Sequence, residues 1–287
     1  MCGRFAVTVD PALLAEQIRA IDETGASSPT SDAATNYATP NYNVAPNYNV
    51  APNYNVAPTA TVATVVARHD DPDDEATRRV RLMRWGLLPS WVKAGPDGRP
   101  LAKGQLINAR ADKVITSPAF RAAARHKRCL VPMDGYYEWM PSPLPMDTAP
   151  AGRKARKTPF FMYREDGRPL FMAGLWSVWK PDASNPRVAA LLPAGTAAPL
   201  PTFTIITTDA VGELARVHDR MPLAVAEQDW DRWLDPDQPA PAGLLAAPPD
   251  ISGITLREVS TLVNSVANNG PALIEPAEPG NQPVGLF

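Results

Sequence analysis

Short apolar segments bounded by turn-forming residues dominate the hydrophobic pattern of this chain. Each carries aromatic or β-branched residues, which is typical of short strands joined by many loops. The predicted strands are Thr61–Val66, Val80–Trp85, Arg128–Val131, Tyr136–Trp139, Phe160–Tyr163, Leu170–Leu175, Phe203–Thr207 and Thr255–Val259. Apolar residues at helical spacing predict helices at Leu13–Ile21, Ser117–Arg125 and Glu227–Leu234. We therefore expect an α+β fold with a largely antiparallel, barrel-like β-sheet core and a few flanking helices.

No change of composition divides the chain, so we expect one domain over residues 1–276. Pro-rich stretches at 141–159, 181–201 and 235–250 fall between predicted elements and are interpreted as surface insertions. Residues 277–287 are expected to form a flexible tail.

A tandem repeat interrupts this pattern. The hexapeptide Asn-Tyr-Asn-Val-Ala-Pro occurs at 41–46, 47–52 and 53–58. Its period is too short for the common helical solenoids, so we interpret it as a local duplication, or a sequencing artefact, that lengthens one loop. The third copy runs directly into the strand predicted from Thr61 and is expected to occupy the structural position.

Composition narrows the class of protein. Of 287 residues, 45% are hydrophobic and 20% are charged, as in globular proteins. The 33 prolines, about 11% against a usual share of about 5%, exclude a mostly helical bundle. No apolar run approaches the roughly 20 residues that span a membrane, and the first residues lack the regions of a signal peptide. Two cysteines, Cys2 and Cys129, do not make a disulfide framework, so we expect a cytoplasmic protein.

Charge is distributed unevenly along the chain. The net charge is −2, but residues 78–128 hold 13 Lys/Arg against two acidic residues, a local charge of +11. The rest of the chain carries −13. This asymmetry indicates either a basic face that could contact nucleic acid or a solvated surface patch.

Cys2 is the sharpest candidate for chemistry. Removal of Met1 would expose a cysteine that bears both a free α-amine and a thiol, each partly deprotonated near neutral pH. The thiol could attack an acyl carbon with the amine as base. Alternatively, amine and thiol together could capture an aldehyde as a five-membered thiazolidine ring. The remaining interpretation is an incidental cysteine in a frayed terminus.

Other polar residues have sequence neighbours that make them candidates for chemistry. Glu138 stands among aromatic residues on a predicted strand, either exposed or held for proton transfer. His218 precedes an apolar segment and could be a general acid or base, or a surface residue. Asn108 offers an amide dipole and Arg110 a phosphate-binding fork. Cys129 is interpreted as a buried structural thiol.

Metal and nucleotide sites find no support in the sequence. There is no CxxC or HxxxH spacing and no glycine-rich phosphate loop. We therefore expect neither a metal nor another cofactor.

Ten short motifs, in this order, resemble those of the SOS-response-associated peptidase (SRAP) family. They are Met1–Phe5, Tyr54–Pro58, Arg84–Trp91, Ile107–Ala111, Arg128–Pro132, Gly135–Trp139, Ala173–Trp176, Phe203–Thr208, His218–Pro222 and Val259–Ser260. The resemblance covers residues 2 to about 276. It implies a thiol enzyme that shields abasic sites in single-stranded DNA, by linking its N-terminal cysteine to the ring-opened sugar through a thiazolidine.

Carried onto this chain, the resemblance assigns four catalytic residues. Cys2 supplies amine and thiol, and Glu138 shuttles protons during imine formation and ring closure. His218 protonates the ring oxygen as the closed sugar opens, and Asn108 holds Cys2 and the sugar in register. Reversal of the crosslink is also expected to involve Glu138.

The resemblance further implies contacts to the DNA strand. Arg4, Arg110 and Arg220 are expected on phosphates. Trp85 and Pro58 are expected near the bases, and Thr207 in a backbone contact. The partner is abasic single-stranded DNA, and the protein is expected to be a nucleoid-associated monomer that contacts no membrane.

Two other function classes remain open. One is an N-terminal-nucleophile cysteine hydrolase, either a peptidase or an amidotransferase, which predicts an acyl-enzyme. The other is a module that binds single strands or modified bases without crosslinking. An abasic-DNA adduct that depends on Cys2 separates all three.

Overall fold

The computed structural model describes residues 2–25, 51–95, 100–102, 104–141, 157–180 and 199–277. Its strands are β1 (Arg4–Val7), β2 (Ile21–Asp22), β3 (Asn53–Val56), β4 (Thr61–Arg68), β5 (Thr77–Trp85), β6 (Asn108–Arg110), β7 (Arg128–Met133), β8 (Gly135–Pro141), β9 (Lys157–Arg164), β10 (Leu170–Trp179), β11 (Leu200–Asp209), β12 (Arg220–Pro222) and β13 (Ile254–Glu258). The α-helices are α1 (Pro11–Gln17), α2 (Arg121–His126), α4 (Trp230–Leu234) and α5 (Ala242–Ala246). Short 3-10 helices are η2 (Gly212–Arg216), η3 (Glu227–Asp229), η4 (Thr261–Asn264) and η5 (Pro271–Leu273).

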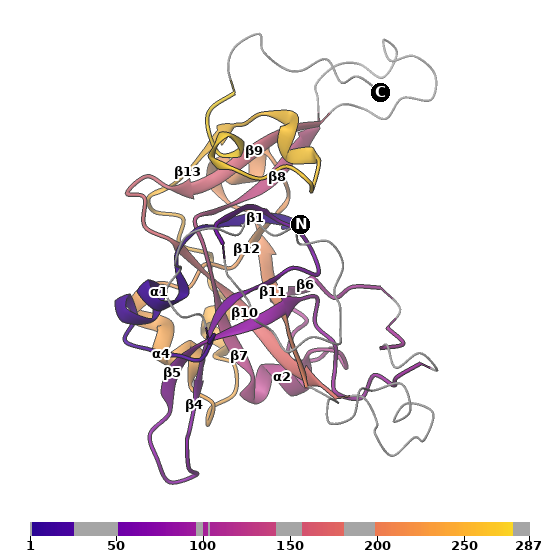
Figure 1. Ribbon diagram of the computed structural model, residues 1–287, viewed down its shortest axis with the longest axis vertical. Helices are drawn as coiled ribbons and strands as arrows, with labels where there is room; N and C mark the ends of the chain where they lie inside the picture. The colour runs from indigo at the N-terminus through magenta and orange to yellow at the C-terminus, as the bar shows by residue number, and fades with distance from the viewer. Residues whose placement is uncertain are drawn as a thin grey trace.

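A closed ring of strands forms the centre of the molecule (Figure 1). Strands β5, β4, β7, β10 and β11 pair antiparallel in that order, and β11 returns to pair parallel with β5. Closure leaves these strands few free edges. The short strands β6 and β12 pair with β11, and β2 pairs with β5. The expected α+β domain with a largely antiparallel, barrel-like core is confirmed.

A second antiparallel sheet, in the order β13-β9-β8-β1-β3, lies above this ring in Figure 1. The chain passes from the ring into this sheet between β7 and β8, at Gly135. A Cβ on Gly135 would lie 2.3 Å from the Met162 carbonyl oxygen, so only glycine allows this close approach. The crossing carries the aromatic and acidic residues of β8 from the ring to the N-terminal strand β1.

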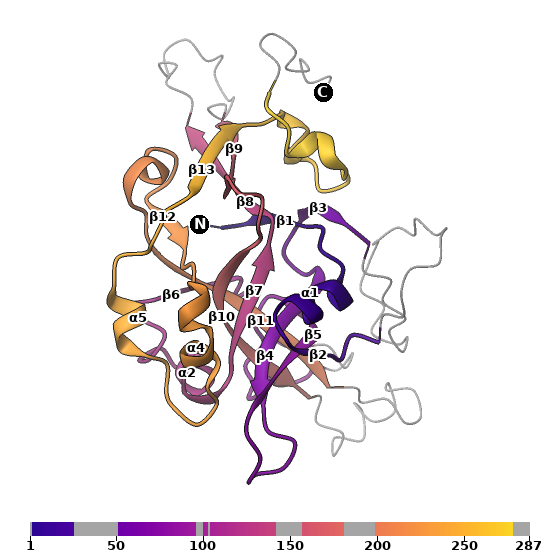
Figure 2. The same cartoon turned by 90° about the vertical axis from the view of Figure 1, so that its left-hand side faces the viewer.

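Two large apolar clusters fill the molecule. One packs α1, α2 and α4 against the ring, as Figure 2 shows from the side. The other combines residues of the ring with β1 and β8, and it includes Cys2, Phe5, Trp85, Tyr136 and Phe203. The start of the chain therefore belongs to the hydrophobic core.

Each predicted strand is present, but several predicted boundaries are wrong. Helix α1 starts at Pro11, where the Asp10 side chain accepts from two backbone N–H groups. It ends at Gln17, and Ile21 belongs to β2. The predicted helix at Ser117–Arg125 begins only at Arg121, and the one at Glu227–Leu234 divides into η3 and α4.

The stretch 235–250 is not a surface insertion. It contains α5 and buries Ala240 and Leu245 in the helix-side cluster. Most of 141–159 and 181–201 lies outside the described residues, as does the tail after Ala277. In the described part, no helix has the length and apolar character needed to cross a membrane.

The third repeat copy forms β3 and pairs with β1. Its Asn55 side chain donates to the backbone carbonyls of Ser265 and Asn268, at 2.8 and 3.0 Å. The Tyr54 N–H donates to the Asn269 side chain. This copy is thus built into the fold, while residues 41–50 of the repeat lie outside the described residues.

Candidate active site

Cys2 lies inside the molecule and is 0% exposed. The strand that follows it, β1, is held between β8 and β3, and the start of β1 lies close to β12 in both views (Figures 1 and 2). The side-chain amide of Asn108 donates to the Cys2 carbonyl oxygen at 2.7 Å. The interpretation of a frayed terminus is therefore wrong.

Strand β8 brings two ionisable side chains to Cys2. Its register pairs Phe5 with Tyr136, and Glu138 follows two residues later. Tyr136 is 1% exposed and Glu138 is 4% exposed, which rules out the exposed alternative for Glu138. Burial, and then the charge of Glu138, raise the pKa of the Cys2 thiol. Burial, Cys2 and Glu138 together raise the pKa of Tyr136. The three groups are close enough to influence one another electrostatically.

Asn108 comes from β6, which pairs in parallel with β11. Its Nδ2 atom donates to the Cys2 carbonyl, whereas its Oδ1 atom is buried and has no hydrogen-bond partner among the described residues. The Tyr136 hydroxyl is likewise buried without one in the described part of the chain. Buried polar atoms are rarely left unpaired, so each of these two atoms has the capacity for a hydrogen bond to a water or a ligand.

His218 lies in the turn between η2 and β12. Its Nδ1 atom is 2.7 Å from Asp219 Oδ1 and 3.0 Å from the Arg220 backbone nitrogen. One proton state cannot serve both contacts. A protonated Nδ1 donates to Asp219, and an unprotonated Nδ1 accepts from the Arg220 N–H. The Nδ1 atom of His218 therefore has a hydrogen-bond partner whether or not it carries a proton.

The arginines expected on phosphates differ in their surroundings. Arg110 is 56% exposed and forms a two-bonded ion pair with Asp112. Arg220 donates to Asp209 and to the Thr207 carbonyl. Both arginines lie beside the end of β11. The hydrogen bond to Asp112, and then the charges of nearby aspartates, raise the pKa of Arg110.

Arg4 instead supports the fold. Its Nη1 donates to the Asn55 side chain and to the Val263 carbonyl, at 2.7 and 2.9 Å. Burial lowers its pKa. Arg4 thus ties β1 to β3 and η4.

Trp85 does not lie where a base could stack on it. It is 0% exposed, packs between Phe5 and Phe203, and donates its indole N–H to the Ile107 carbonyl. The expectation of Trp85 near the bases is wrong because strand β5 turns this side chain into the core. The Thr207 side chain is also fully buried, whereas Pro58 is half-buried after β3.

Trp91, in the same motif, was not singled out by sequence reasoning. It is 66% exposed. The neighbouring Val92 is buried with Trp179, whose indole N–H donates to the Val92 carbonyl at 2.7 Å. Trp91 therefore projects outward from an anchored segment. The signal in the sequence was a pair of tryptophans, Trp85 and Trp91, in one motif. The sequence alone does not say which of the two is exposed.

Part of the positive charge of the basic segment 78–128 is paired within the described residues. Several of its arginines have ionic or hydrogen-bonded partners, some from distant parts of the chain. These are Arg78 with Asp231, Arg79 with Glu23 and Asp70, Arg81 with Glu23, Arg110 with Asp112, and the buried Arg128 with backbone carbonyls. The ion pairs recruit Asp231, Glu23 and Asp70 from outside the segment, which offsets three of its excess positive charges.

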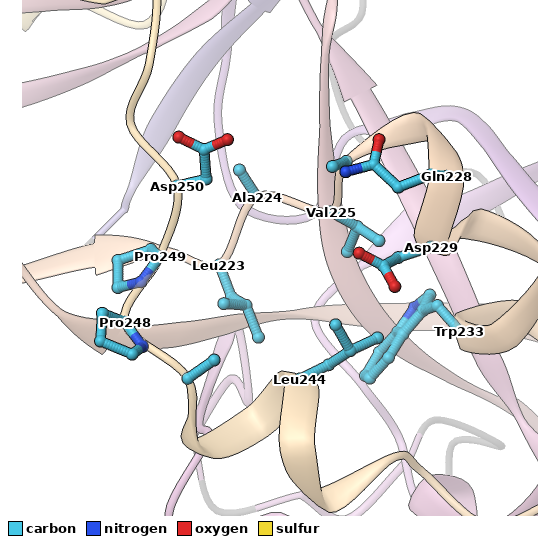
Figure 3. A pocket seen from close by; sticks show the side chains of 12 residues that line it. Leu223, Ala224, Val225, Gln228, Asp229, Trp233, Leu244, Pro248, Pro249 and Asp250 are labelled. Atoms are coloured by element: carbon cyan, nitrogen blue, oxygen red, sulfur yellow. The ribbon is translucent and has the colours of Figure 1, made fainter.

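A separate cavity of about 170 Å³ lies away from the Cys2 site. Leu223, Trp233 and Leu244 line its floor, and Asp229 and Asp250 stand at its rim (Figure 3). None of the residues that line it belongs to the expected site. In the described part of the chain, no three His, Cys, Asp or Glu side chains gather to hold a metal ion.

Comparisons with known proteins show which proteins this chain is similar to. Abasic site processing protein YoqW of Bacillus subtilis is 33% identical over 205 residues, 71% of this chain and 79% of that protein. YMR114C of Saccharomyces cerevisiae, also named an abasic site processing protein, is 31% identical over 96% of this chain and 68% of its own. A crystal structure of a Bacteroides thetaiotaomicron protein has the same fold, with a TM-score of 0.66 at 21% identity, covering 96% of this chain and all of that one. The family model "SOS response associated peptidase (SRAP)" matches residues 1–266, and the chain therefore belongs to the SRAP family.

Proposed function

We propose that this protein captures the aldehyde of abasic sites in single-stranded DNA on Cys2, after removal of Met1. The observation that carries the proposal is the setting of Cys2. It is fully buried, held by Asn108 at its carbonyl, and coupled to Glu138. Relatives that are named abasic site processing proteins support the choice of substrate.

The proposed reaction is a condensation. The α-amine of Cys2 adds to the aldehyde carbon of the ring-opened sugar and forms a C–N bond, and the carbonyl oxygen becomes a hydroxyl. Loss of that hydroxyl as water gives an imine. The thiol sulfur then adds to the imine carbon, and its proton passes to nitrogen. The product is a thiazolidine plus one water.

With Met1 still attached, the electrostatics of Cys2 suit this order of steps. Catalytic cysteines that attack acyl groups have a lowered thiol pKa, because the thiolate is the nucleophile. Here burial and Glu138 raise the pKa of the Cys2 thiol. A neutral thiol that waits for the imine suits amine-first capture, whereas a cysteine hydrolase would require the opposite shift.

Three side chains would assist. Glu138 would carry protons to the leaving hydroxyl and from the thiol. His218, with a partner for Nδ1 in both proton states, would protonate the ring oxygen as the sugar opens. Asn108 would keep the amine and the aldehyde at reacting distance, which raises their effective concentration.

Arg110 and Arg220 would bind phosphates flanking the site. Each is already paired with an aspartate, so a phosphate must compete with Asp112 or Asp209. Such binding should be weak and strongly salt-dependent. Arg4 would contribute through its bracing of β1.

The proposed contact with bases moves from Trp85 to Trp91. An exposed indole on an anchored segment can stack on an unpaired base regardless of sequence. Pro58 would border the strand, and Thr207 would contribute through its backbone only, because its side chain is buried.

The test is incubation with single-stranded DNA that carries one abasic site, followed by a denaturing gel. We expect a shifted band for the wild type, none for Cys2→Ala, and none for a form that retains Met1, which has no free Cys2 amine. Hydrolysis of glutamine or a peptide without any adduct would instead favour an N-terminal-nucleophile hydrolase. Salt-sensitive DNA binding without an adduct would favour a binding module.

A further inference from the structure

Two consecutive tyrosines on β8 differ in the hydrogen bonding of their hydroxyl groups. The Tyr137 hydroxyl donates to the Tyr54 carbonyl at 2.7 Å and so joins β8 to β3. The Tyr136 hydroxyl points to the other side of the strand, where it is buried without a hydrogen-bond partner among the described residues. The two residues are a natural pair for comparison.

Tyr136 is 1% exposed, so a hydroxyl without a hydrogen bond lowers the free energy of unfolding at this position. Phenylalanine would fill the same space without that cost. The apolar part of Tyr136 packs in the cluster that holds Phe5 and Trp85, so packing alone does not explain the oxygen. An atom of this kind points to a ligand that is absent from the protein alone.

The neighbours of Tyr136 indicate which atom of a ligand its hydroxyl would contact. Tyr136 pairs with Phe5 across β8 and β1 and belongs to the same apolar cluster as Cys2. The charges of Cys2 and Glu138 act on its hydroxyl. Burial and these two neighbours raise the pKa of Tyr136. The phenol therefore keeps its proton at neutral pH and can act as a donor.

We propose that Tyr136 is a further catalytic residue, whose hydroxyl donates a hydrogen bond to the aldehyde oxygen of the abasic sugar while the Cys2 amine adds to it. As the C–N bond forms, the π electrons of the carbonyl move to oxygen, and the hydrogen bond stabilises the growing negative charge. The proton that completes the hydroxyl comes from the adding amine, by way of Glu138. Tyr136 remains a phenol throughout. This inference rests on the proposed function.

The experiment compares Tyr136→Phe with Tyr137→Phe. Three quantities are measured for each variant: the rate of adduct formation at saturating abasic DNA, the affinity for a strand with a stable tetrahydrofuran abasic analogue, and Tm. Tyr136→Phe should slow adduct formation by about 10²-fold, the usual effect of losing one such donor. Its affinity should be unchanged and its Tm equal to or above that of the wild type, because a costly unpaired group has been removed. Tyr137→Phe should keep the wild-type rate and lose Tm.

The inference is overturned if Tyr136→Phe forms the adduct within twofold of the wild-type rate, or if it loses Tm as Tyr137→Phe does. In either case a wild-type adduct that depends on Cys2 would leave the proposed function standing. A wild-type protein that forms no adduct would overturn both. The Tm readout separates a catalytic role from a structural one, since a structural hydroxyl would cost stability when removed.

Discussion

The two cysteines of this chain are equally buried but have different neighbours. Cys2 and Cys129 are both 0% exposed and belong to the same apolar cluster, and burial raises the pKa of both thiols. Cys129 faces Gly174 on β10, where a Cβ would lie 2.7 Å from its sulfur. Cys2 instead lies beside Asn108, Tyr136 and Glu138.

Burial alone therefore does not identify a reactive cysteine in this protein. The sulfur of Cys129 lies so close to Gly174 that packing explains the glycine. Around Cys2 two buried polar atoms, Asn108 Oδ1 and Tyr136 Oη, have no partner in the described part of the protein. The difference between the two thiols is the unfilled hydrogen-bonding capacity near Cys2, which the proposed substrate would use.

The strongest test on the Cys2 side is Glu138→Gln. The amide keeps the shape of the carboxylate but cannot carry a proton, so adduct formation should slow by about 10²–10⁴-fold. Single-turnover rates on abasic DNA measure this, and Glu165→Gln in the exposed turn after β9 is the matched control. Equal rates for both variants would remove Glu138 from the reaction.

On the Cys129 side, Arg128→Met should affect stability alone. The Arg128 guanidinium donates to the backbone carbonyls of Trp233, Ala124, Arg125, Asp235 and Gln238. Losing these bonds leaves buried carbonyls unpaired, and we expect unfolding in urea to require about 3–5 kcal/mol less free energy. The folded fraction should form the adduct at the wild-type rate, and a slower rate would show that β7 tunes the site.

Gly174→Ala should be destabilising because of Cys129. The new methyl would press on the sulfur, at an expected cost of about 1–3 kcal/mol in the free energy of unfolding. Removing the sulfur makes room, so Gly174→Ala should cost less in a Cys129→Ala background. A double-mutant cycle by urea unfolding measures this coupling. Additive effects would mean that the sulfur does not set the requirement for glycine.

The smallest expected effect is a dependence of stability on alkaline pH, to which both thiols should contribute. Each has a pKa that is higher in the folded state than in the unfolded chain, so the folded state holds its proton more tightly. The stability from each thiol is fully present below about pH 9 and is lost as pH rises above it, with a slope approaching about 1.4 kcal/mol per pH unit. Urea unfolding at several alkaline pH values should show a shallower slope for Cys2→Ala and for Cys129→Ala, by similar amounts. A change in only one variant would indicate that the other thiol is not buried in solution.

The sequence predicts the long elements well and the short ones poorly. Strands such as β4 and β10 carry enough apolar residues to be recognised. Strands β1, β3, β6 and β12 have three or four residues and are fixed by their partners rather than by their own pattern. These short strands carry or adjoin Cys2, Asn108 and His218, so sequence pattern alone could not place the site.

Motif resemblance proposed roles for Cys2, Asn108, Glu138 and His218 that the hydrophobic pattern could not. It did not show which polar atoms have partners, because Tyr136 and Tyr137 are equivalent in sequence and differ only by the face of β8 that each occupies. Trp85 and Trp91 show the same limit. Both lie in one motif, and only tertiary packing buries the first and exposes the second.

The central claim is that the Cys2 amine and thiol together close a ring on the abasic sugar. The most direct measurement is mass spectrometry of the adduct after digestion of protein and DNA. We predict a single linkage on the peptide that begins with Cys2, with a mass equal to peptide plus sugar fragment minus one water and no free thiol on Cys2. A linkage at any other residue, or one on Cys2 that leaves its thiol free for alkylation, would contradict the account.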